Sequence, residues 1–266
     1  MATLDAVPEL PEVERYRQLA ERALDRTIAS VVSPDPWFVK GGADGPALER
    51  ALVGSRFVGT RRIGKLLLLD VGRGPTVGIR FGMTGTLVVD GSAAIGQLLY
   101  SPRRDDPVWD RWAARFDDGG SLVVRDPRRL GGVSLEPDLS GLGPDAATIG
   151  PAALARALAG SAAALKARLL DQSCLAGVGN LIADEVLWRA GLSPLRPAAS
   201  LSRNEARRLH RHLGRTIDDL IERGGSHRGD LMEERHPGGV CPRDGTALAR
   251  STVGGRTSWW CPAHQR

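Results

Sequence analysis

The sequence predicts an α+β protein with a β-rich N-terminal region, a helical region and a small C-terminal hairpin module. Short β-branched and aliphatic runs, separated by Gly, Pro and Asp turns, fill residues 27–133, a spacing typical of antiparallel strands. Apolar residues return at helical spacing after Pro151. Two Cys-Pro pairs, at Cys241 and Cys261, frame a hairpin-like stretch near the C-terminus. Together these observations predict the fold class.

The composition is that of an ordinary globular protein. The chain has 266 residues, of which 42% are hydrophobic and 25% are charged, enough for one large domain or two small ones. No apolar run approaches the roughly eighteen residues of a membrane helix. The acidic, Arg-rich N-terminal region excludes a secretory signal, and three cysteines exclude a disulfide scaffold. We therefore expect a cytoplasmic protein without a membrane partner.

The charge is distributed unevenly along the chain. Residues 1–150 hold 19 Lys and Arg against 20 Asp and Glu, a net charge of −1. Residues 151–266 hold 17 against 11, a net charge of +6. An excess of positive charge in one half is typical of a polyanion-binding element. Charge alone is equally consistent with a basic surface that keeps the protein in solution.

The N-terminal region predicts one helix followed by strands. Residues 11–24 predict the helix, because apolar side chains recur at i, i+3 and i+4 and Pro11 suits a first turn. The runs that follow indicate an antiparallel sandwich or barrel rather than βαβ units. The predicted strands are residues 28–32, 56–60, 66–71, 76–81, 86–89, 112–116 and 122–124. Helix and strands make up a predicted N-terminal domain over residues 8–138.

The C-terminal half predicts two further segments. Residues 139–145 are rich in turn formers and predict a linker. The second domain, residues 146–235, contains predicted helices at residues 151–158, 165–172, 180–190 and 203–223. The third segment, residues 236–266, contains a hairpin over residues 247–260.

A glycine-rich turn, Gly-Val-Gly-Asn at residues 177–180, leads directly into a predicted helix. Glycines let the backbone approach a ligand closely, and a helix N-terminus offers unpaired N–H groups with positive dipole character. A phosphate is the ligand that such a turn suits. A tight turn between two helices explains the same residues without any ligand.

The C-terminal segment carries the spacing of a metal site. Cys241 and Asp244 are separated by two residues, sixteen residues follow, and Cys261 and His264 repeat the same separation. Two ligands three positions apart on a tight turn can reach one tetrahedral ion, and thiolate, imidazole and carboxylate are all zinc ligands. The spacing predicts one structural zinc ion. The alternative is a metal-free hairpin held together by its tryptophans.

Residues 8–14 read Pro-Glu-Leu-Pro-Glu-Val-Glu. Taken alone, they are a helix N-terminus whose acidic side chains complement the helix dipole. Together with the glycine-rich turn and the C-terminal Cys/Asp/Cys/His set, they resemble the formamidopyrimidine-DNA glycosylase/endonuclease VIII family of base-excision repair enzymes. The motifs that carry the resemblance follow the family's order: residues 8–14, 61–69 around Lys65, 82–85 (Gly-Met-Thr-Gly), 126–129 (Asp-Pro-Arg-Arg) and 175–180.

The resemblance implies a bifunctional DNA glycosylase and abasic-site lyase whose nucleophile is Pro8. In the family this proline is N-terminal, and its secondary amine attacks C1′ of the damaged nucleotide. An α-amine titrates near pH 8 rather than about 10.4, so roughly a tenth of it is free base at pH 7. The iminium that forms is an electron sink for strand cleavage. The resemblance assigns acid–base chemistry to Glu9, phosphate contact and β-elimination to Lys65, and δ-elimination to Arg256.

The resemblance also implies the architecture and the DNA contacts. It implies a β-sandwich with a flanking helix, a helix–two-turn–helix domain and a zinc-finger hairpin, acting as a monomer on double-stranded damaged DNA at the nucleoid. The duplex would lie between the domains and be bound mostly through phosphates, so affinity would fall steeply with salt. The residues expected to contact the backbone or to fill the gap left by a flipped base are Met83, Arg128, Arg129, Leu130, Lys166 and Asn180.

The chain departs from the family pattern in its motifs. Six residues stand between Met1 and Pro8, and an internal proline is an amide without a nucleophilic lone pair. A start at Val7 or processing to Pro8 would free the amine. Leu130 stands where the family usually has an aromatic wedge. In the C-terminal set, an Asp and a His replace two cysteines.

The loop before the metal set is short as well. Only fifteen residues separate Gly225 from Cys241, where formamidopyrimidine-type members carry a longer loop that caps 8-oxoguanine. Two alternatives follow from these departures. One is a non-catalytic damaged-DNA-binding protein of the same fold, if Pro8 is not the mature N-terminus. The other is an endonuclease VIII-like enzyme specific for oxidised pyrimidines.

Overall fold

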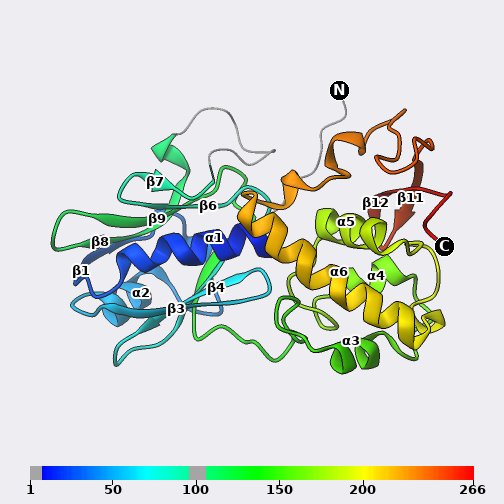
Figure 1. Cartoon of the computed structure of the whole chain (residues 1–266). Helices are drawn as coiled ribbons and strands as arrows, with labels where there is room; N and C mark the ends of the chain where they lie inside the picture. The colour runs from blue at the N-terminus through cyan, green and yellow to red at the C-terminus, as the bar shows by residue number, and fades with distance from the viewer. Residues whose placement is uncertain (1–7, 96–105) are drawn as a thin grey trace. The chain divides into compact units, whose positions relative to one another are not determined.

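The computed structural model describes residues 8–95 and 106–266 (Figure 1). Contacts divide the chain into two compact units. The β unit consists of Pro8 and residues 12–139, and the helical unit consists of residues 9–11 and 140–266. The short segment Glu9–Pro11 therefore belongs with residues that follow it by more than a hundred positions.

The β unit is built from two five-stranded sheets. Their strand orders are β1-β8-β9-β6-β7 and β2-β10-β5-β4-β3. In the part of the chain that the structure describes, neighbouring strands are antiparallel apart from β2 and β10. The elements are α1 (Leu10–Ala20, from residue 12 onward in this unit), α2 (Gly45–Leu52), β1 (Ile28–Val32), β2 (Val39–Lys40), β3 (Phe57–Ile63), β4 (Leu66–Val71), β5 (Val77–Arg80), β6 (Thr86–Val89), β7 (Ser92–Ala93), β8 (Asp110–Phe116), β9 (Ser121–Arg125) and β10 (Gly132–Leu135).

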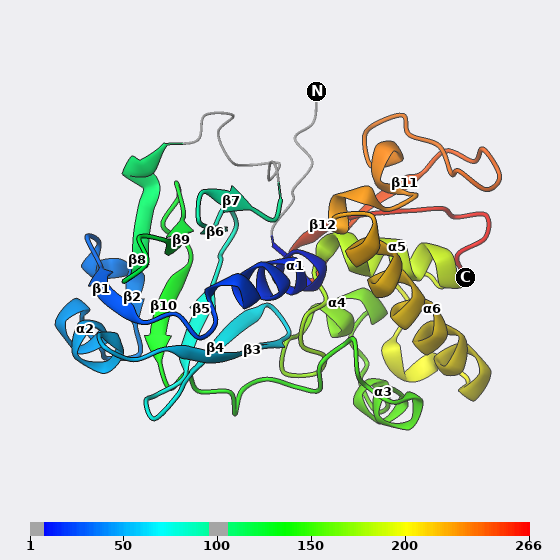
Figure 2. The same ribbon diagram turned by 60° about the vertical axis from the view of Figure 1, so that its left-hand side comes forward.

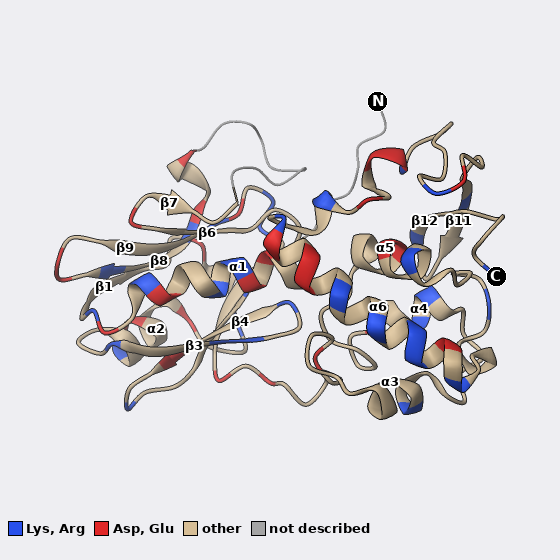
Figure 3. Ribbon diagram, in the orientation of Figure 1, with Lys and Arg blue, Asp and Glu red and all other residues tan. Residues whose placement is uncertain are grey.

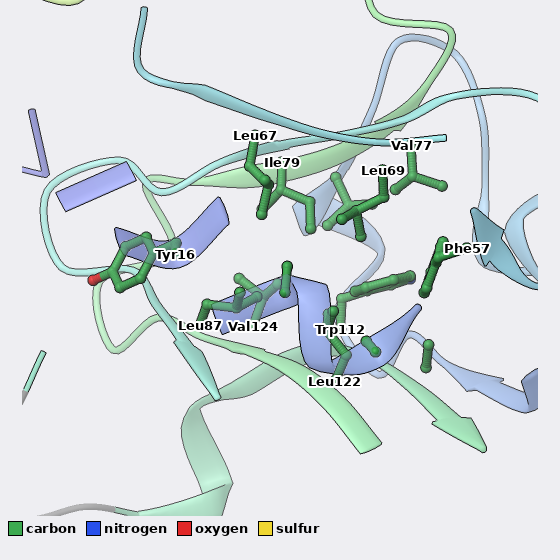
Figure 4. Packing of buried hydrophobic residues seen from close by; sticks show 14 of the residues in the cluster. Tyr16, Phe57, Leu67, Leu69, Val77, Ile79, Leu87, Trp112, Leu122 and Val124 are labelled. Carbon is green, nitrogen blue, oxygen red and sulfur yellow. The ribbon is translucent and has the colours of Figure 1, made fainter. Parts of the chain in front are cut away.

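The two sheets share one apolar core (Figure 4). Alternate residues along a strand point to opposite faces, so β9 buries Leu122 and Val124 and half-exposes their neighbours. Tyr16 of α1 enters the same core, where its hydroxyl donates a 3.2 Å hydrogen bond to the carbonyl of Gly85. Burial raises the pKa of that hydroxyl well above its ordinary value. The predicted antiparallel sandwich with a flanking helix is confirmed.

The helical unit contains four α-helices and one two-stranded hairpin among its described residues (Figure 2). Its longest helix begins with a capping box, in which Ser202 and Glu205 bind each other's backbone N–H groups. Among the described residues of the whole chain, no helix has the length and apolar character that a membrane span needs. The elements are α3 (Pro151–Leu158), α4 (Leu165–Leu170), α5 (Asn180–Ala190), α6 (Arg203–Glu222), β11 (Ala249–Val253) and β12 (Arg256–Trp260).

Four elements, α2, β2, β7 and β10, have no clear signal in the local sequence pattern. The eight-residue helix α2 starts after Asp44, whose carboxylate accepts a 2.8 Å hydrogen bond from the N–H of Ala47. This Asp-Gly-Pro start reads locally as a turn. The four residues of β10 become a strand because β5 and β2 flank them on both sides, so their pairing depends on residues far along the chain.

Candidate active site and metal centre

Glu9 is buried at the N-terminus of α5. Its side chain is 1% exposed, and its carboxylate accepts hydrogen bonds from the N–H groups of Gly179 (3.0 Å), Leu181 (2.9 Å) and Ile182 (3.1 Å). These are donors that a helix leaves unpaired at its first turn. A Cβ on Gly179 would lie 2.1 Å from the Glu9 carboxyl carbon, so only glycine allows this approach.

Of the two interpretations of the glycine-rich turn, this geometry favours a close packing turn over a phosphate site formed by its backbone N–H groups. The carboxylate of Glu9 already satisfies the N–H groups that a phosphate would use. Asn180, the first residue of α5, is half-buried. Its Oδ1 accepts no hydrogen bond from the described residues, so the side chain retains an unused acceptor beside Glu9.

Pro8 directly precedes Glu9 and is buried. It belongs to the β unit, and the residues before it lie outside the described part of the chain. Pro8 is therefore covalently next to a carboxylate whose position is set by three backbone hydrogen bonds.

Lys65 lies in the two-residue turn between β3 and β4, where Ile63 pairs with Leu66. Gly64 takes the positive φ of +56° that the first central position of such a hairpin turn requires. The guanidinium of Arg62 donates a 2.9 Å hydrogen bond to the carbonyl of Gly64. The half-buried Lys65 side chain thus extends from a turn that the Arg62 hydrogen bond helps to hold.

Asp126 joins two loops that the sequence analysis assigned to DNA contact. It has no exposed surface. Its carboxylate accepts hydrogen bonds from Thr84 Oγ1 (2.6 Å), Arg128 N (3.1 Å) and Gly131 N (2.8 Å). Thr84 follows the half-buried Met83 in the loop between β5 and β6. The structure therefore brings the Met83 loop and the Arg128 loop together.

The residues after Arg128 have different surroundings. Leu130 is 50% exposed, an unusual position for a large apolar side chain. A Cβ on Gly82 would lie 2.5 Å from the carbonyl carbon of Leu130, which confirms the close approach of the two loops. Arg129 donates two hydrogen bonds, of 2.6 and 2.7 Å, to Asp35, and this contact lowers the pKa of that carboxyl. The Arg129 guanidinium is thus committed to a carboxylate, while Arg128 is exposed.

Asp184, in the middle of α5, is the centre of a buried polar network. Its side chain is 1% exposed. It pairs with the ammonium of Lys166 (2.7 Å) and the guanidinium of Arg235 (2.8 Å). It also accepts hydrogen bonds from Ser258 Oγ (2.8 Å) and Trp259 N (3.2 Å). One carboxylate therefore links α4, α5, the segment before the metal set, and β12.

This network holds the strand that carries Arg256. The Lys166 ammonium also donates a 3.0 Å hydrogen bond to the carbonyl of Thr257. Gly254 and Gly255, with φ of +57° and +71°, form the turn that presents the exposed Arg256. Lys166 itself has no exposed surface, and burial lowers the pKa of its ammonium, partly countered by the Asp184 charge. In this conformation Lys166 faces Asp184 and Thr257 rather than a surface that DNA can reach.

The segment between α6 and the metal set is tied to α5. Glu185 accepts hydrogen bonds from the N–H groups of Asp230 (3.1 Å) and Leu231 (3.0 Å). Arg189 pairs with the Asp230 carboxylate at 2.8 Å, and Leu231 is fully buried. These contacts fix the segment against the helix.

The four predicted metal ligands come together. Cys241, Asp244, Cys261 and His264 each place one ligand atom within 4.8 Å of all the others. Cys241 Sγ lies 3.6 Å from His264 Nδ1, Cys261 Sγ lies 3.4 Å from an Asp244 oxygen, and that oxygen lies 3.2 Å from Nδ1. A tetrahedral ion with bonds of about 2.0–2.3 Å requires ligand separations of roughly 3.3–3.7 Å. The set therefore fits one metal ion.

The surroundings of the ligands suit a metal as well. His264 Nε2 lies 3.2 Å from the carbonyl of Trp188, which leaves Nδ1 free to face the centre. The indole N–H of Trp188 donates a 3.3 Å hydrogen bond to Cys241 Sγ. Second contacts of this kind set the tautomer and orientation of metal ligands.

Sequence reasoning missed the carboxylates Asp126, Asp184 and Glu185. A signal was available for two of them. Asp184 and Glu185 interrupt a helix whose other residues from Leu181 to Trp188 are apolar, and a charged pair in such a helix is buried and therefore paired. No local signal identifies their distant partners Leu231, Arg235 and Trp259, which lie 46, 51 and 75 positions away.

The comparisons with known proteins agree on one family over nearly the whole chain. Residues 7–133 match the formamidopyrimidine-DNA glycosylase N-terminal domain, and residues 141–230 match the formamidopyrimidine-DNA glycosylase H2TH domain. A formamidopyrimidine-DNA glycosylase of Chloroflexus aggregans is 34% identical over 97% of this chain and 98% of that protein. One of Geobacillus kaustophilus is 33% identical over 98% of this chain and all of its own length.

Solved structures give the same answer. The Lactococcus lactis Fpg in complex with DNA containing an abasic site has a TM-score of 0.81 at 25% identity, covering 97% of this chain and 99% of that one. A complex of the same organism's protein with DNA containing FAPY-dG has a TM-score of 0.81 at 26% identity, covering 97% and 100%. Sequence, domain order and fold all place this chain in the formamidopyrimidine-DNA glycosylase family.

Proposed function

We propose that this protein is a base-excision repair DNA glycosylase with abasic-site lyase activity, and that Pro8 is its nucleophile. The observation that carries the proposal is the Pro8–Glu9 pair, in which a buried carboxylate, held by three N–H groups at the N-terminus of α5, follows the proline directly. Relatives named formamidopyrimidine-DNA glycosylase, which match 97% and 98% of the chain, support it. Borohydride trapping on abasic-site DNA tests it.

The chemistry needs Pro8 as a free secondary amine. The Pro8 ammonium first passes one proton to the Glu9 carboxylate. The freed lone pair attacks C1′, the bond from C1′ to the base breaks, and the base leaves with the bonding electrons and takes the remaining N–H proton. Glu9 then gives its proton to the deoxyribose ring oxygen as the ring opens, and the nitrogen becomes an iminium. Loss of a C2′ proton then expels the 3′ phosphate. Hydrolysis of the iminium returns Pro8.

The exposed and half-buried residues of the predicted set supply the DNA contacts. We assign phosphate contact to Lys65, Asn180 and Arg256, with the Lys65 amine also moving the proton in β-elimination. Met83, Arg128 and Leu130 fill the gap that a flipped base leaves. We assign Arg129 and Lys166 an indirect part, because their cationic groups bind Asp35 and Asp184.

We assign catalysis to residues 8–138, DNA binding to residues 146–235 and the metal centre to residues 236–266. We propose that the protein acts as a monomer and, because its substrate is DNA, that it acts at the nucleoid. A non-catalytic damaged-DNA-binding role would follow only if Pro8 stays within an amide.

We propose that the metal is zinc and that it is structural. All four positions are taken by protein side chains, the arrangement of a closed structural site. Bound there, zinc would cross-link the two turns that flank the β11–β12 hairpin. Freshly purified protein should contain about one zinc per chain, with Zn–S distances of about 2.3 Å by X-ray absorption.

The cysteines provide a matched control for the metal. Cys261→Ser should lose the zinc, whereas Cys174→Ser should keep it, because the Cys174 thiol lies apart in the apolar core of the helical unit. Protein prepared without chelators that contains no zinc would support the metal-free hairpin instead.

The short segment before the metal set predicts the substrate preference. Discrimination of 8-oxoguanine from guanine depends on hydrogen bonds along the edge of the flipped base. Each such contact is worth about 1–3 kcal/mol, or roughly one to two decades in rate. The segment that would supply them is short and bound to α5 by Glu185 and Arg189. Cleavage at an abasic site requires no base pocket.

We therefore expect abasic-site cleavage to exceed 8-oxoguanine excision by about 10- to 100-fold. Single-turnover rates on two duplexes that differ only at the lesion measure the ratio. A third duplex, with an oxidised pyrimidine in the same sequence context, tests the endonuclease VIII-like alternative, which predicts that this base is released faster than 8-oxoguanine. Release of 8-oxoguanine at an equal or faster rate would show that the short segment is no handicap.

A further inference from the structure

One face of α6 carries a row of arginines that no part of the proposed chemistry uses. Arg203, Arg207, Arg211 and Arg215 follow one another at intervals of four residues, and all four are exposed. We call these four residues the α6 stripe. Among the described residues none of them has a carboxylate or hydrogen-bond partner, unlike Arg196 and Arg223, which flank the helix and are paired with Glu205 and Asp219.

The stripe lies opposite the face by which α6 packs in the helical unit. That packing face consists of Ala206, Leu209, Leu213, Thr216, Ile217 and Leu220. Figure 3 shows basic residues along much of α6 and acidic ones toward its C-terminal end. The stripe arginines therefore lie on the exposed side of the folded helix, and packing of the core does not require them.

The arrangement of charge opposes the stability of the helix itself. Positive side chains are favourable near a helix C-terminus, yet α6 has no basic residue in its last turn, and Arg203 and Arg207 lie near its start. Like charges four residues apart repel each other, and the stripe contains three such pairs in succession. Helix formation does not explain these residues, and a bound anion would relieve their mutual repulsion.

The positive surface continues beyond α6. Burial lowers the pKa of the half-buried His212, and the nearby charges of Arg211 and Arg243 lower it further. Arg243 belongs to the first turn of the metal set and lies over the ring of Trp188 at 4.4 Å. Residues from α6 and from the metal module thus contribute to one electropositive region.

We propose that the α6 stripe binds the phosphate backbone of double-stranded DNA, independently of sequence and of damage. Its four members span about 18 Å of helix, with about 6 Å and 40° between neighbours. That length matches about five phosphates along one strand of a duplex. The long arginine side chains can reach across the angle of about 40° between neighbours.

The composition of the face favours DNA over an acidic protein. Protein interfaces depend on apolar and aromatic side chains at their centre, and none of the exposed large apolar residues of the described chain lies on α6. Charge without an apolar centre is what sequence-independent phosphate binding uses. The identity of the anion rests on the proposed function as a DNA glycosylase.

The test replaces the four stripe arginines by glutamine, which keeps helix propensity. The control replaces Arg50, Arg73, Arg115 and Arg156 by glutamine, since these are exposed and lie apart on α2, the β4–β5 turn, β8 and α3. Both variants have the same net charge. Anisotropy measures the affinity of each full-length variant for an undamaged 30-base-pair duplex over a range of salt concentrations.

The stripe variant should bind the duplex at least about tenfold more weakly at 0.1 M salt. The slope of the logarithm of its binding constant against the logarithm of salt concentration should fall in magnitude by up to about 3.6, because each of four lost phosphate contacts contributes about 0.9. The dispersed variant should change less than about threefold. Equal affinities of the two variants would overturn the proposal. So would a stripe-dependent affinity for poly-glutamate equal to that for the duplex, which would indicate an acidic protein.

Single-turnover cleavage of an abasic-site duplex, measured up to saturating enzyme, separates this inference from the proposed function. The enzyme concentration that gives half of the maximal cleavage rate should be at least about tenfold higher for the stripe variant than for the unchanged protein. Normal cleavage with no difference in duplex affinity refutes the stripe alone. Absence of both cleavage and duplex binding in the unchanged protein refutes the proposed function and the stripe with it.

Discussion

A chain that begins at Pro8 will be trapped on abasic-site DNA by borohydride, and a chain that keeps residues before Pro8 will not. Borohydride reduces an iminium to a stable amine, so the crosslink reports the covalent step directly. An amide nitrogen has no nucleophilic lone pair, so an N-terminal extension should lower trapping by about a thousandfold or more. Denaturing gels measure the crosslink, and intact mass verifies the first residue of each preparation.

The matched control keeps an amine at the same place. A chain that begins at residue 8 with Pro8→Gly has a primary amine, and its trapping should be much weaker but measurable. Glu9 and its hydrogen bonds to α5 remain in both chains. Strong trapping by a preparation whose mass shows Met1 and all following residues would rule out Pro8 as the nucleophile.

Removing the charge of Asp184 should destabilise the protein by about 3–5 kcal/mol, because Asp184→Asn leaves the buried cations of Lys166 and Arg235 uncompensated. Urea unfolding of the full chain gives this value from the midpoint and the slope. Asp218→Asn is the matched control, since Asp218 is exposed on α6 and its loss should change stability by less than about 0.5 kcal/mol.

A double-mutant cycle measures how much of the lost stability belongs to the ion pair between Asp184 and Lys166. Lys166→Met removes the second charge, so the double variant should be more stable than the sum of the two single effects predicts, by about 0.5–3 kcal/mol. The network also holds β12, which carries Arg256. Cleavage by the folded Asp184→Asn variant should therefore fall about as far as cleavage by an Arg256→Gln variant. Additive losses within error would show that Lys166 and Asp184 are not coupled.

Local patterns were enough to predict much of this protein. Strands 66–71 and 86–89 and the helix over residues 180–190 have the predicted bounds, because alternation and helical spacing are properties of neighbouring residues. The metal set was predictable for the same reason. Each half of it is a short turn whose two ligands are three positions apart.

The sequence alone determined the family, the order of the domains and the four residues of the candidate metal site, since these follow from motifs and spacings along the chain. Only the tertiary structure decided what the charged residues bind. It brought Glu9 to Gly179 across 170 positions and paired the buried Lys166 with Asp184. A charge inside a protein must find an opposite charge or a hydrogen-bond donor, and which one it finds depends on chain segments that meet only when the fold is complete.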